Sequence, residues 1–354
     1  MKKNQVKIIG VMSGTSLDGI DLVSVIFNYE NQWKFTIEKA ETVPYPLALK
    51  KALAAAINSS EKELLTLNIS YTRFLGAVIL QFIQKNNIRD IDAISSHGHT
   101  IKHEPQNNFT LQIGNRPELA KIVKHVVVCD FRVQDVQMGG QGAPLVPFGD
   151  EILFNEFRYC LNLGGFANIS ASEDEKRIAY DICAVNTVLN FYAEKLGYDF
   201  DENGKIAESG VFNETLFQQL QQLDFYKKKP PKSLGIEWVK SQVFPILKEF
   251  EEDIPSVLNT YTLHVASQIA ENIKNKKGVS VLVTGGGAFN TFLIKTLKSK
   301  TKAKIILPSS EIINFKEALV FAFLGLRKLR GEINVQASVT GAKKDHSSGN
   351  IFTP

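Results

Sequence analysis

VKIIGVMSGTSLDGIDLVSVIF, from Val6 to Phe27, is the stretch that sets the fold of this chain. Its first apolar run, Val6 to Met12, is typical of a buried strand. Turn-forming residues interrupt the run from Ser13 to Gly19, and a second β-rich run follows from Asp21 to Phe27. The stretch therefore predicts a strand, a turn and a second strand. A Walker-type phosphate loop would instead lead into a helix and carry a lysine followed by Ser or Thr.

The tip of this hairpin combines three kinds of polar group. They are the glycines Gly14 and Gly19, the hydroxyls of Ser13, Thr15 and Ser16, and the carboxylates of Asp18 and Asp21. Glycines let backbone N–H groups approach a phosphate closely, and hydroxyls donate further hydrogen bonds. Because two carboxylates repel bare phosphate, this function requires a cation such as Mg²⁺ between them, held through water. The alternative is an ordinary hairpin turn with Asp-Gly at its tip.

Length and composition limit the class of protein. A chain of 354 residues favours two domains, and 44% hydrophobic with 22% charged residues is typical of a soluble globular protein. The net charge of +4 is too small to indicate a nucleic-acid partner. No signal peptide or membrane-spanning run is predicted, so we expect a cytoplasmic protein without a membrane partner. Three isolated cysteines, Cys129, Cys160 and Cys183, are predicted to be buried thiols.

The second half of the chain repeats the opening pattern. Arg158 to Leu163 and Phe166 to Ser172 predict two strands around Gly164-Gly165, and alternating strands and helices follow in both halves. The glycine-dense segment Gly139 to Pro144 is predicted to divide the halves, and the polar tail packs on the surface or on the first half. We therefore predict related α/β domains of residues 1–133 plus 332–354 and residues 134–331. Facing domains of this kind form a cleft for small ligands.

Asp181 is the leading candidate for catalysis. It follows a predicted strand, Ile178 to Tyr180, and precedes a predicted helix, and ligands meet open α/β sheets at strand ends. Its carboxylate is a candidate general base toward a hydroxyl or a water, and the alternative is a helix N-cap. A lost cap costs about 0.5–2 kcal/mol of stability. A lost general base costs about 10²–10⁴-fold in rate.

Gly285, Gly286 and Gly287 follow the predicted strand VSVLVT and precede a helix that begins near Asn290. Bare backbone at this point suits a nucleotide, and a tight strand–helix turn is the alternative. Glu317 lies on a predicted helix, either as a cap or as a residue that lines the cleft.

His97, His99 and His103 lie close in sequence but follow no metal-ligand spacing, so a metal site is disfavoured. His97 is predicted to be a hydrogen-bonding residue of the cleft. Arg132, Gln141 and the backbone around Gly142 are candidate donors to a substrate, and the alternative is a role in the architecture of the boundary loop.

GVMSGTSLDGID, from Gly10 to Asp21, closely resembles the phosphate-binding signature of the anhydro-N-acetylmuramic acid kinase family. Further similar segments follow in the family's order along nearly the whole chain. They are SHGHTIKHEP (96–105), LQIGNRPELA (111–120), DFRVQDVQMGGQGAPLVP (130–147), NLGGFANIS (162–170), DENGKIAESG (201–210), PKSLGIEW (231–238), VTGGGAFN (283–290), KEALVFAFLG (316–325) and VTGA (339–342).

This resemblance implies the fold of the actin, sugar-kinase and heat-shock-ATPase superfamily. That is an α/β fold of two related actin-like domains, each a mixed sheet with helices, facing across a nucleotide-binding cleft. The implied reaction uses ATP and Mg²⁺. Water opens the 1,6-anhydro ring of anhydro-N-acetylmuramate, and phosphorylation of O6 gives N-acetylmuramate 6-phosphate and ADP, a step in peptidoglycan recycling. Asp181 holds the place of the aspartate that activates the water.

The resemblance also implies the binding residues. The ATP site would contain Gly14, Thr15, Ser16, Leu17, Asp18, Gly19, Ile20, Asp21, Gly164, Gly165, Gly285, Gly286, Gly287, Asn290 and Glu317. Residues expected to bind the sugar are His97, Gln112, Arg132, Gln141 and Asn186, and Mg²⁺ would be held by Asp18 and Asp21. The sequence leaves open whether the chain forms a homodimer.

The chain departs from the family at two places. The family usually has Asp-Thr-Gly-Pro-Gly-Asn where this chain reads Asp181-Ile182-Cys183-Ala184-Val185-Asn186, and His99 stands where Gln is usual. Two alternatives follow: a kinase of the same fold for another amino sugar, and a nucleotide-binding relative without sugar turnover.

Overall fold

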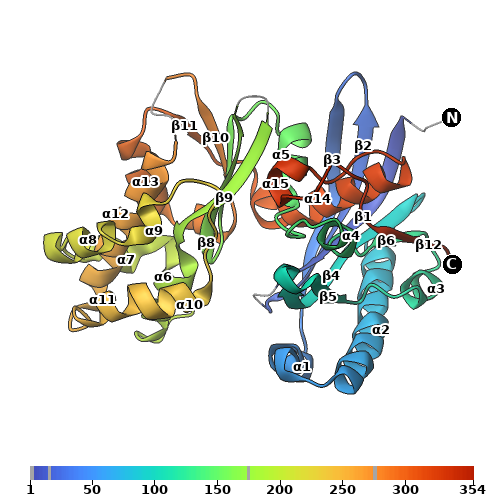
Figure 1. Ribbon diagram of the computed structural model, residues 1–354, viewed down its shortest axis with the longest axis horizontal. Coiled ribbons are helices and arrows are strands. Elements are labelled where there is room, and N and C mark those ends of the chain that lie inside the picture. Colours follow the sequence, from blue (N-terminus) through green and yellow to red (C-terminus); the bar gives the residue numbers. More distant parts are fainter. Residues whose placement is uncertain (1–3, 15–16, 174–175, 274–276) are drawn as a thin grey trace. The chain divides into compact units, whose positions relative to one another are not determined.

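The computed structural model describes residues 4–14, 17–173, 176–273 and 277–354 (Figure 1). The chain forms two compact units: unit 1 is Met1–Leu153 with Phe315–Pro354, and unit 2 is Phe154–Asn314. Each unit is a mixed sheet with helices, which confirms the predicted α/β class. The divisions lie after residues 153 and 314, whereas the sequence analysis placed them after residues 133 and 331.

Unit 1 contains a seven-stranded sheet in which six strands follow the order β12-β6-β4-β1-β2-β3 and β5 pairs with β4. The first three strands of the chain form an antiparallel meander, and β4 is parallel to β1 while β6 is parallel to β4. The strands are β1 (Gln5–Ser13), β2 (Gly19–Tyr29), β3 (Trp33–Pro44), β4 (Ala93–Glu104), β5 (Phe109–Ile113), β6 (Val127–Cys129) and β12 (Asn350–Phe352). The predicted hairpin is confirmed, since Met12 of β1 pairs with Asp21 of β2.

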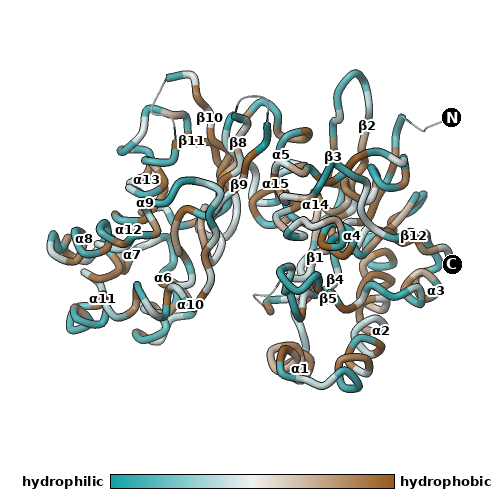
Figure 2. Tube along the Cα trace, viewed as in Figure 1, coloured by the Kyte–Doolittle hydropathy of each residue, from teal (hydrophilic) through white to brown (hydrophobic). Residues whose placement is uncertain are grey.

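Seven α-helices of the described chain contribute to unit 1. They are α1 (Leu47–Ala55), α2 (Glu61–Lys85), α3 (Glu118–Val123), α4 (Val133–Gln137), α5 (Val146–Leu153), α14 (Ser310–Leu329) and α15 (Ala337–Thr340). The apolar residues of α2 recur at helical spacing, and their buried members include Leu64, Tyr71, Leu75 and Phe82. In Figure 2 the tube of α2 accordingly alternates between hydrophobic and hydrophilic colour.

Packing around α14 explains where unit 1 ends along the chain. A Cβ added to Gly10 of β1 would lie 2.1 Å from the carbonyl oxygen of Ala318, so strand and helix approach closely only because residue 10 is glycine. Phe148 of α5 stacks on Phe323 of α14 with ring centroids 6.3 Å apart. These contacts place α5 and most of α14 in unit 1, although the sequence analysis put both in the second domain.

Unit 2 repeats the topology of unit 1. Its five-stranded sheet has the order β11-β10-β7-β8-β9, again a three-stranded antiparallel meander continued by two parallel strands. The strands are β7 (Tyr159–Leu163), β8 (Phe166–Glu173), β9 (Lys176–Ala184), β10 (Ser280–Thr284) and β11 (Lys304–Ile306). The internal repeat expected from two glycine-tipped hairpins is therefore confirmed at the level of strand order and direction.

Eight α-helices complete the described part of unit 2, together with short helical turns such as η5 (Gly286–Phe289). They are α6 (Asn186–Glu194), α7 (Lys205–Ser209), α8 (Glu214–Gln221), α9 (Asp224–Lys227), α10 (Ile236–Trp238), α11 (Phe244–Lys248), α12 (Ile254–Glu271) and α13 (Thr291–Lys300). The core packs β7, β8 and β10 against α12, where Tyr261 and Val265 are fully buried. The three cysteines are free and buried, as predicted.

Two strands continue further than the sequence indicates. β4 runs to Glu104 because β5 pairs with its second half, so His97 and His99 lie within a strand. β9 runs to Ala184 because its pairing with β8 extends to Phe166, so Asp181 also lies inside a strand. Pro117 occupies the N-cap position of α3.

Candidate functional site

The hairpin tip of unit 1 leads into a well-anchored second strand. Thr15 and Ser16 lie outside the described residues; Leu17 has a left-handed backbone, with φ of 60°, and Asp18 is exposed. Gly19 has no room for a side chain, because an added Cβ would lie 2.4 Å from the carbonyl oxygen of Val43, and Ile20 is buried in the core. The described part of the tip therefore places an exposed carboxylate directly before a closely packed glycine.

Asp21 is the second acid of this tip. Its Oδ1 accepts a hydrogen bond of 2.6 Å from the hydroxyl of Thr42 on β3. Burial raises the pKa of Asp21, the Thr42 hydrogen bond lowers it, and the negative charge of Asp18 raises it again. A cation beside both carboxylates would relieve that repulsion, and carboxylate oxygens are ligands that Mg²⁺ prefers.

Ser13, the last residue of β1, is the centre of a buried hydroxyl cluster. The Tyr71 hydroxyl donates to Ser13 Oγ over 2.8 Å, His99 Nδ1 lies 2.9 Å from the same oxygen, and the Tyr45 hydroxyl also contacts it. Burial lowers the pKa of His99 to about 4, so its ring is neutral near pH 7. Tyr45 and Tyr71 were not predicted as site residues, because the sequence shows only the helical spacing or the strand context of each tyrosine.

His97 and Arg132 form a directed pair. Arg132 Nε donates to His97 Nε2 over 2.8 Å, and guanidinium nitrogens only donate, so Nε2 must carry a lone pair. His97 Nδ1 then carries the proton and donates to the carbonyl oxygen of Gly98 over 2.9 Å. Burial first, and the positive charge of Arg132 second, lower the pKa of His97 well below its usual value. His97 is therefore a neutral acceptor that orients Arg132.

Arg132 is also held from its other end. Its Nη1 donates to the carbonyl oxygen of Gly142 over 2.6 Å, and the negative charges of Glu317 and Asp135 act on the guanidinium. Burial lowers the pKa of Arg132 to about 10, so the side chain stays positively charged near neutral pH. The guanidinium is therefore a cation whose position is fixed by His97 of β4 and by the glycine-rich loop after α4, residues 139–142.

The remaining predicted residues of unit 1 differ in exposure. Gln112 is buried on β5, where its Nε2 donates to Thr110 Oγ1 over 2.8 Å and its Oε1 accepts nothing from the described residues. Gln141 is exposed on the glycine-rich loop. Glu317 is exposed on α14, which begins at Ser310, so it is not the helix cap considered above.

Unit 2 brings two glycine turns together. Gly164 and Gly165 form the tip between β7 and β8, and Gly285 begins the turn after β10 with φ of 82°. A Cβ on Gly285 would lie 2.8 Å from the carbonyl oxygen of Leu163, beside the first turn. Asn186, the first residue of α6, lies near both, because its Nδ2 bonds the Leu163 carbonyl oxygen at 3.4 Å and is 3.7 Å from a Cβ built on Gly286.

Asn290 has a structural task next to these turns. Its Oδ1 accepts from the backbone N–H of Leu293 over 2.9 Å and so caps α13. The same oxygen leaves no room for a side chain on Gly204, where an added Cβ would lie 2.2 Å away. The turn Gly285 to Asn290 is thereby fixed at its far end.

Asp181 projects from β9 toward the connector that precedes α10. Its Oδ2 accepts from the backbone N–H of Leu234 over 2.9 Å and from Ser233 Oγ over 3.2 Å. No hydrogen bond from the described residues reaches Oδ1. The N-cap of α6 is Val185, so the alternative of Asp181 as a cap is wrong. Ser233 and Leu234, which were not among the predicted site residues, hold the carboxylate.

The departure from the family motif falls on core positions. Ile182, Cys183, Ala184 and Val185 are all fully buried within unit 2, between Asp181 and Asn186. Larger side chains at these positions fill the core, and the backbone N–H of Val185 is bonded to the carbonyl oxygen of Gly165. The altered residues therefore leave both polar ends of the motif in place.

The described residues contain no group of three or more His, Cys, Asp and Glu side chains placed to hold a metal ion. Asp18 and Asp21 are a pair of carboxylates, which is smaller than such a group, and carboxylate oxygens suit Mg²⁺. No helix among the described residues combines the length and apolar character needed to cross a bilayer.

A family model described as anhydro-N-acetylmuramic acid kinase matches residues 6–354. The chain belongs to this family. Proteins named anhydro-N-acetylmuramic acid kinase from Pseudomonas syringae and Sulfurimonas denitrificans are each 33% identical to it, with 97% of this chain and 98% of theirs covered. The protein of that name from Acinetobacter baylyi is 32% identical over 94% of this chain and 96% of its own. The predicted family is thus confirmed.

Solved structures similar to the chain are more distant. The activator of the 2-hydroxyisocaproyl-CoA dehydratase from Clostridium difficile has a TM-score of 0.46 and 14% identity, and covers 92% of this chain and 96% of its own. A ROK family glucokinase from Streptomyces griseus has a TM-score of 0.41 and 12% identity, and covers 90% of this chain and 99% of its own. The assignment to the kinase family therefore depends on the sequence relatives.

Proposed function

We propose that this protein is an ATP-dependent kinase that opens 1,6-anhydro-N-acetylmuramate with water and phosphorylates O6. The products would be N-acetylmuramate 6-phosphate and ADP, as expected of a step that recycles peptidoglycan sugars. The observation that carries the proposal is the family match over residues 6–354. The intact Asp181 and Asn186, with buried side chains between them, favour this activity over a relative that has lost turnover.

Asp181 is assigned as the general base. Two donors hold its Oδ2, which leaves Oδ1 to take a proton from water. The water oxygen forms a bond to the anomeric carbon, the bond from that carbon to O6 breaks, and the electron pair stays on O6. O6 then forms a bond to the γ-phosphorus of ATP as the bond to the β-phosphate oxygen breaks, which releases ADP.

The glycine turns are assigned to the nucleotide. Gly164, Gly165 and the turn from Gly285 to Gly287 present backbone without side chains, which suits close approach of phosphate or ribose. The unit 1 tip from Gly14 to Asp21, including Thr15 and Ser16, and the carboxylate of Glu317 are assigned to the same ligand. Asp18 and Asp21 would hold Mg²⁺, which neutralises phosphate charge when bound.

We expect Gly285→Ala to weaken nucleotide binding and to destabilise unit 2 by about 1–3 kcal/mol. The added Cβ would lie 2.7 Å from Asn162 Oδ1 and would force a non-glycine residue to φ of 82°. Gly278→Ala is the matched control, because Gly278 has φ of 86° but an added Cβ there meets nothing within 4 Å. Calorimetry with a non-hydrolysable ATP analogue measures the nucleotide affinity of both variants. Equal affinities would remove Gly285 from the nucleotide site.

The sugar is assigned to a set of polar side chains. Arg132 supplies a fixed positive charge for the carboxylate of the lactyl group, and His97 orients it. Gln141 is exposed and Gln112 Oε1 has no partner among the described residues, so both are suited to polar groups of the sugar. Asn186 of unit 2 is assigned to the same ligand.

Purified protein with ATP and Mg²⁺ tests the function directly. We expect phosphosugar from anhydro-N-acetylmuramate, with one oxygen from ¹⁸O-labelled water at the anomeric position. Product only from free N-acetylmuramate would remove the hydrolytic step and indicate a kinase for another amino sugar. ATP binding without product from any muramic derivative would instead indicate the relative without turnover.

The pH dependence of turnover tests Asp181 as the base. Burial raises the pKa of Asp181, whereas the hydrogen bonds from Leu234 and Ser233 lower it. Since only the deprotonated form accepts a proton, kcat/KM should fall as the pH drops through this raised pKa. Ser233→Ala removes one of the lowering bonds, so the acid limb should move to higher pH.

The measurement is kcat/KM for the anhydro sugar between about pH 4 and pH 8. Ser241→Ala is a control from the same region, because the exposed Ser241 hydroxyl bonds the carbonyl oxygen of Trp238 and the side chain of Gln242 and does not bond Asp181. Its profile should match that of the unmodified protein. An acid limb that stays in place or moves to lower pH in Ser233→Ala would contradict the assignment.

We also propose a cytoplasmic location, where ATP is available. The three cysteines are free and buried, which suits a reducing compartment. A homodimer is proposed as the assembly to test, and sedimentation of the purified protein decides it.

A further inference from the structure

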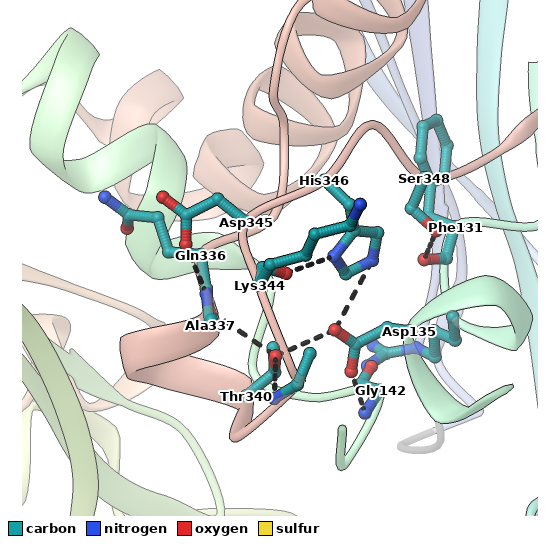
Figure 3. Close-up of polar contacts among 12 residues, drawn as sticks. Phe131, Asp135, Gly142, Gln336, Ala337, Thr340, Lys344, Asp345, His346 and Ser348 are labelled. Atoms are coloured by element: carbon teal, nitrogen blue, oxygen red, sulfur yellow. Dashed lines mark hydrogen bonds and ion pairs between the residues drawn. The ribbon is translucent and has the colours of Figure 1, made fainter. Parts of the chain in front are cut away.

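Asp135 is a fully buried acid of unit 1 that the reaction described above does not use. Its Oδ2 accepts from the backbone N–H of Gly142 over 2.6 Å, and its Oδ1 accepts from Thr340 Oγ1 over 2.7 Å. His346 Nε2 faces Oδ1 at 3.5 Å. Figure 3 shows these groups around the carboxylate, with Thr340 and His346 coming from the C-terminal segment.

The same contacts fix the glycine-rich loop, residues 139–142. The N–H of Gly140 donates to the Asp135 carbonyl oxygen over 2.9 Å, and the N–H of Gln141 donates to the Thr340 carbonyl oxygen over 2.8 Å. A Cβ on Gly140 would lie 2.2 Å from Asp135 Oδ2, so the loop closes onto the carboxylate only with glycine there. Three successive loop N–H groups therefore bond to Asp135 or Thr340.

This loop carries one group assigned to the sugar, Gln141, and holds a second, Arg132. The carbonyl oxygen of Gly142 accepts from Arg132 Nη1 over 2.6 Å, so a movement of the loop displaces the guanidinium. Gln141 lies between the two pinned glycines and projects an exposed side chain. Asp135 itself contributes negative charge beside Arg132. The positions of both sugar-binding groups thus depend on a carboxylate and a C-terminal hydroxyl that are not themselves assigned to the sugar.

We propose that Asp135 and Thr340 are positioning residues for sugar binding, and that α15 supports the sugar site through them. This inference rests on the proposed function, because it assumes that Arg132 and Gln141 bind the sugar. It explains why a segment distant in sequence ends against the loop after α4: residues 135 and 340 are 205 positions apart.

Thr340→Val tests the inference with little change of shape. The variant removes the hydroxyl that bonds Asp135 and keeps a β-branched side chain. We expect KM for the sugar to rise at least about tenfold, the loss that corresponds to about 1.4 kcal/mol of binding. KM for ATP and the fraction of folded protein should stay near their usual values. Thr340→Ser restores the hydroxyl and should restore KM for the sugar.

Ser348→Ala is the matched control for general loosening of the C-terminal segment. Ser348 Oγ is also buried, but it donates to the carbonyl oxygen of Phe131 over 2.6 Å and does not touch the loop. We expect this variant to lose stability while KM for the sugar changes less than about twofold. A comparable rise of KM in both variants would mean that the segment acts only through overall stability, and would overturn the inference.

Hydrogen exchange of the peptide that contains residues 139–142 gives a readout independent of turnover. We expect about tenfold faster exchange there in Thr340→Val, as for a bond weakened by about 1.4 kcal/mol, and unchanged exchange in Ser348→Ala. Equal exchange in Thr340→Val and the unmodified protein would overturn the inference. If the unmodified protein fails to phosphorylate the sugar, the proposed function fails, and the exchange result alone still decides whether Thr340 fixes the loop.

Discussion

Asp181→Asn is expected to lower kcat on anhydro-N-acetylmuramate by at least about a hundredfold. Asparagine keeps the size of the side chain, and its amide oxygen can accept the bonds that Leu234 and Ser233 now donate to Oδ2. Its amide nitrogen would then occupy the position of Oδ1, and an amide nitrogen cannot take a proton from water. The fold and the affinity for an ATP analogue should therefore survive while the ring-opening step is lost.

Single-turnover formation of the phosphosugar measures the loss of the chemical step. Calorimetry separately measures the affinity for the ATP analogue. Asp224→Asn is a suitable control, since Asp224 is an acid of unit 2 that pairs with Lys227 on the surface. That variant should retain full turnover. Near-normal turnover in Asp181→Asn would show that Asp181 is not the base, and its role would be limited to holding the 233–234 connector.

Lys316→Met is expected to destabilise unit 1 by about 3–5 kcal/mol. Lys316 Nζ lies 3.1 Å from Asp150 Oδ1, and each side chain is only 4% exposed. Methionine has a similar length but no charge, so the variant removes the positive charge that faces the buried carboxylate. Uncompensated burial of a charge is costly because the carboxylate loses water without gaining an opposite charge.

Urea unfolding in a Trp238→Phe background isolates the signal of unit 1, because the only other tryptophan, Trp33, lies there. Adding Asp150→Asn to Lys316→Met removes both charges and should restore much of the lost stability. Lys295→Met should cost no more than about 1 kcal/mol, since its pairing with Glu208 is on the surface. A small loss in Lys316→Met, or no recovery in the double variant, would contradict a dominant role for the buried pair.

Local sequence patterns predicted the parts of the site that are formed by residues close together in the chain. The hairpin from Gln5 to Tyr29 and the turn at Gly164-Gly165 follow from apolar runs broken by turn residues. The glycines after β10 were visible for the same reason, because a strand followed by consecutive glycines must end in a tight turn. Strand ends were predicted less well, since a strand continues wherever a neighbour pairs with it, as β8 does beside Asp181.

Contacts between distant residues were not predictable from such patterns. Ser13, Tyr45, Tyr71 and His99 share one hydroxyl cluster, yet they come from β1, the segment after β3, α2 and β4. Arg132 was singled out from sequence, but its orientation by His97 and Gly142 required the tertiary structure. A single sequence holds no signal for such pairs, because each residue type is common and only the packing selects its partner.

The sequence by itself determined the family, the two glycine-tipped hairpins and the identity of the candidate base, because these depend on residue types in short, ordered segments. Only the tertiary structure decided which oxygen of Asp181 is held by Ser233 and Leu234, and that the C-terminal segment reaches Asp135 to fix the loop beside Arg132. The physical reason is that hydrogen bonds between residues 52 or 205 positions apart form only after the chain has packed.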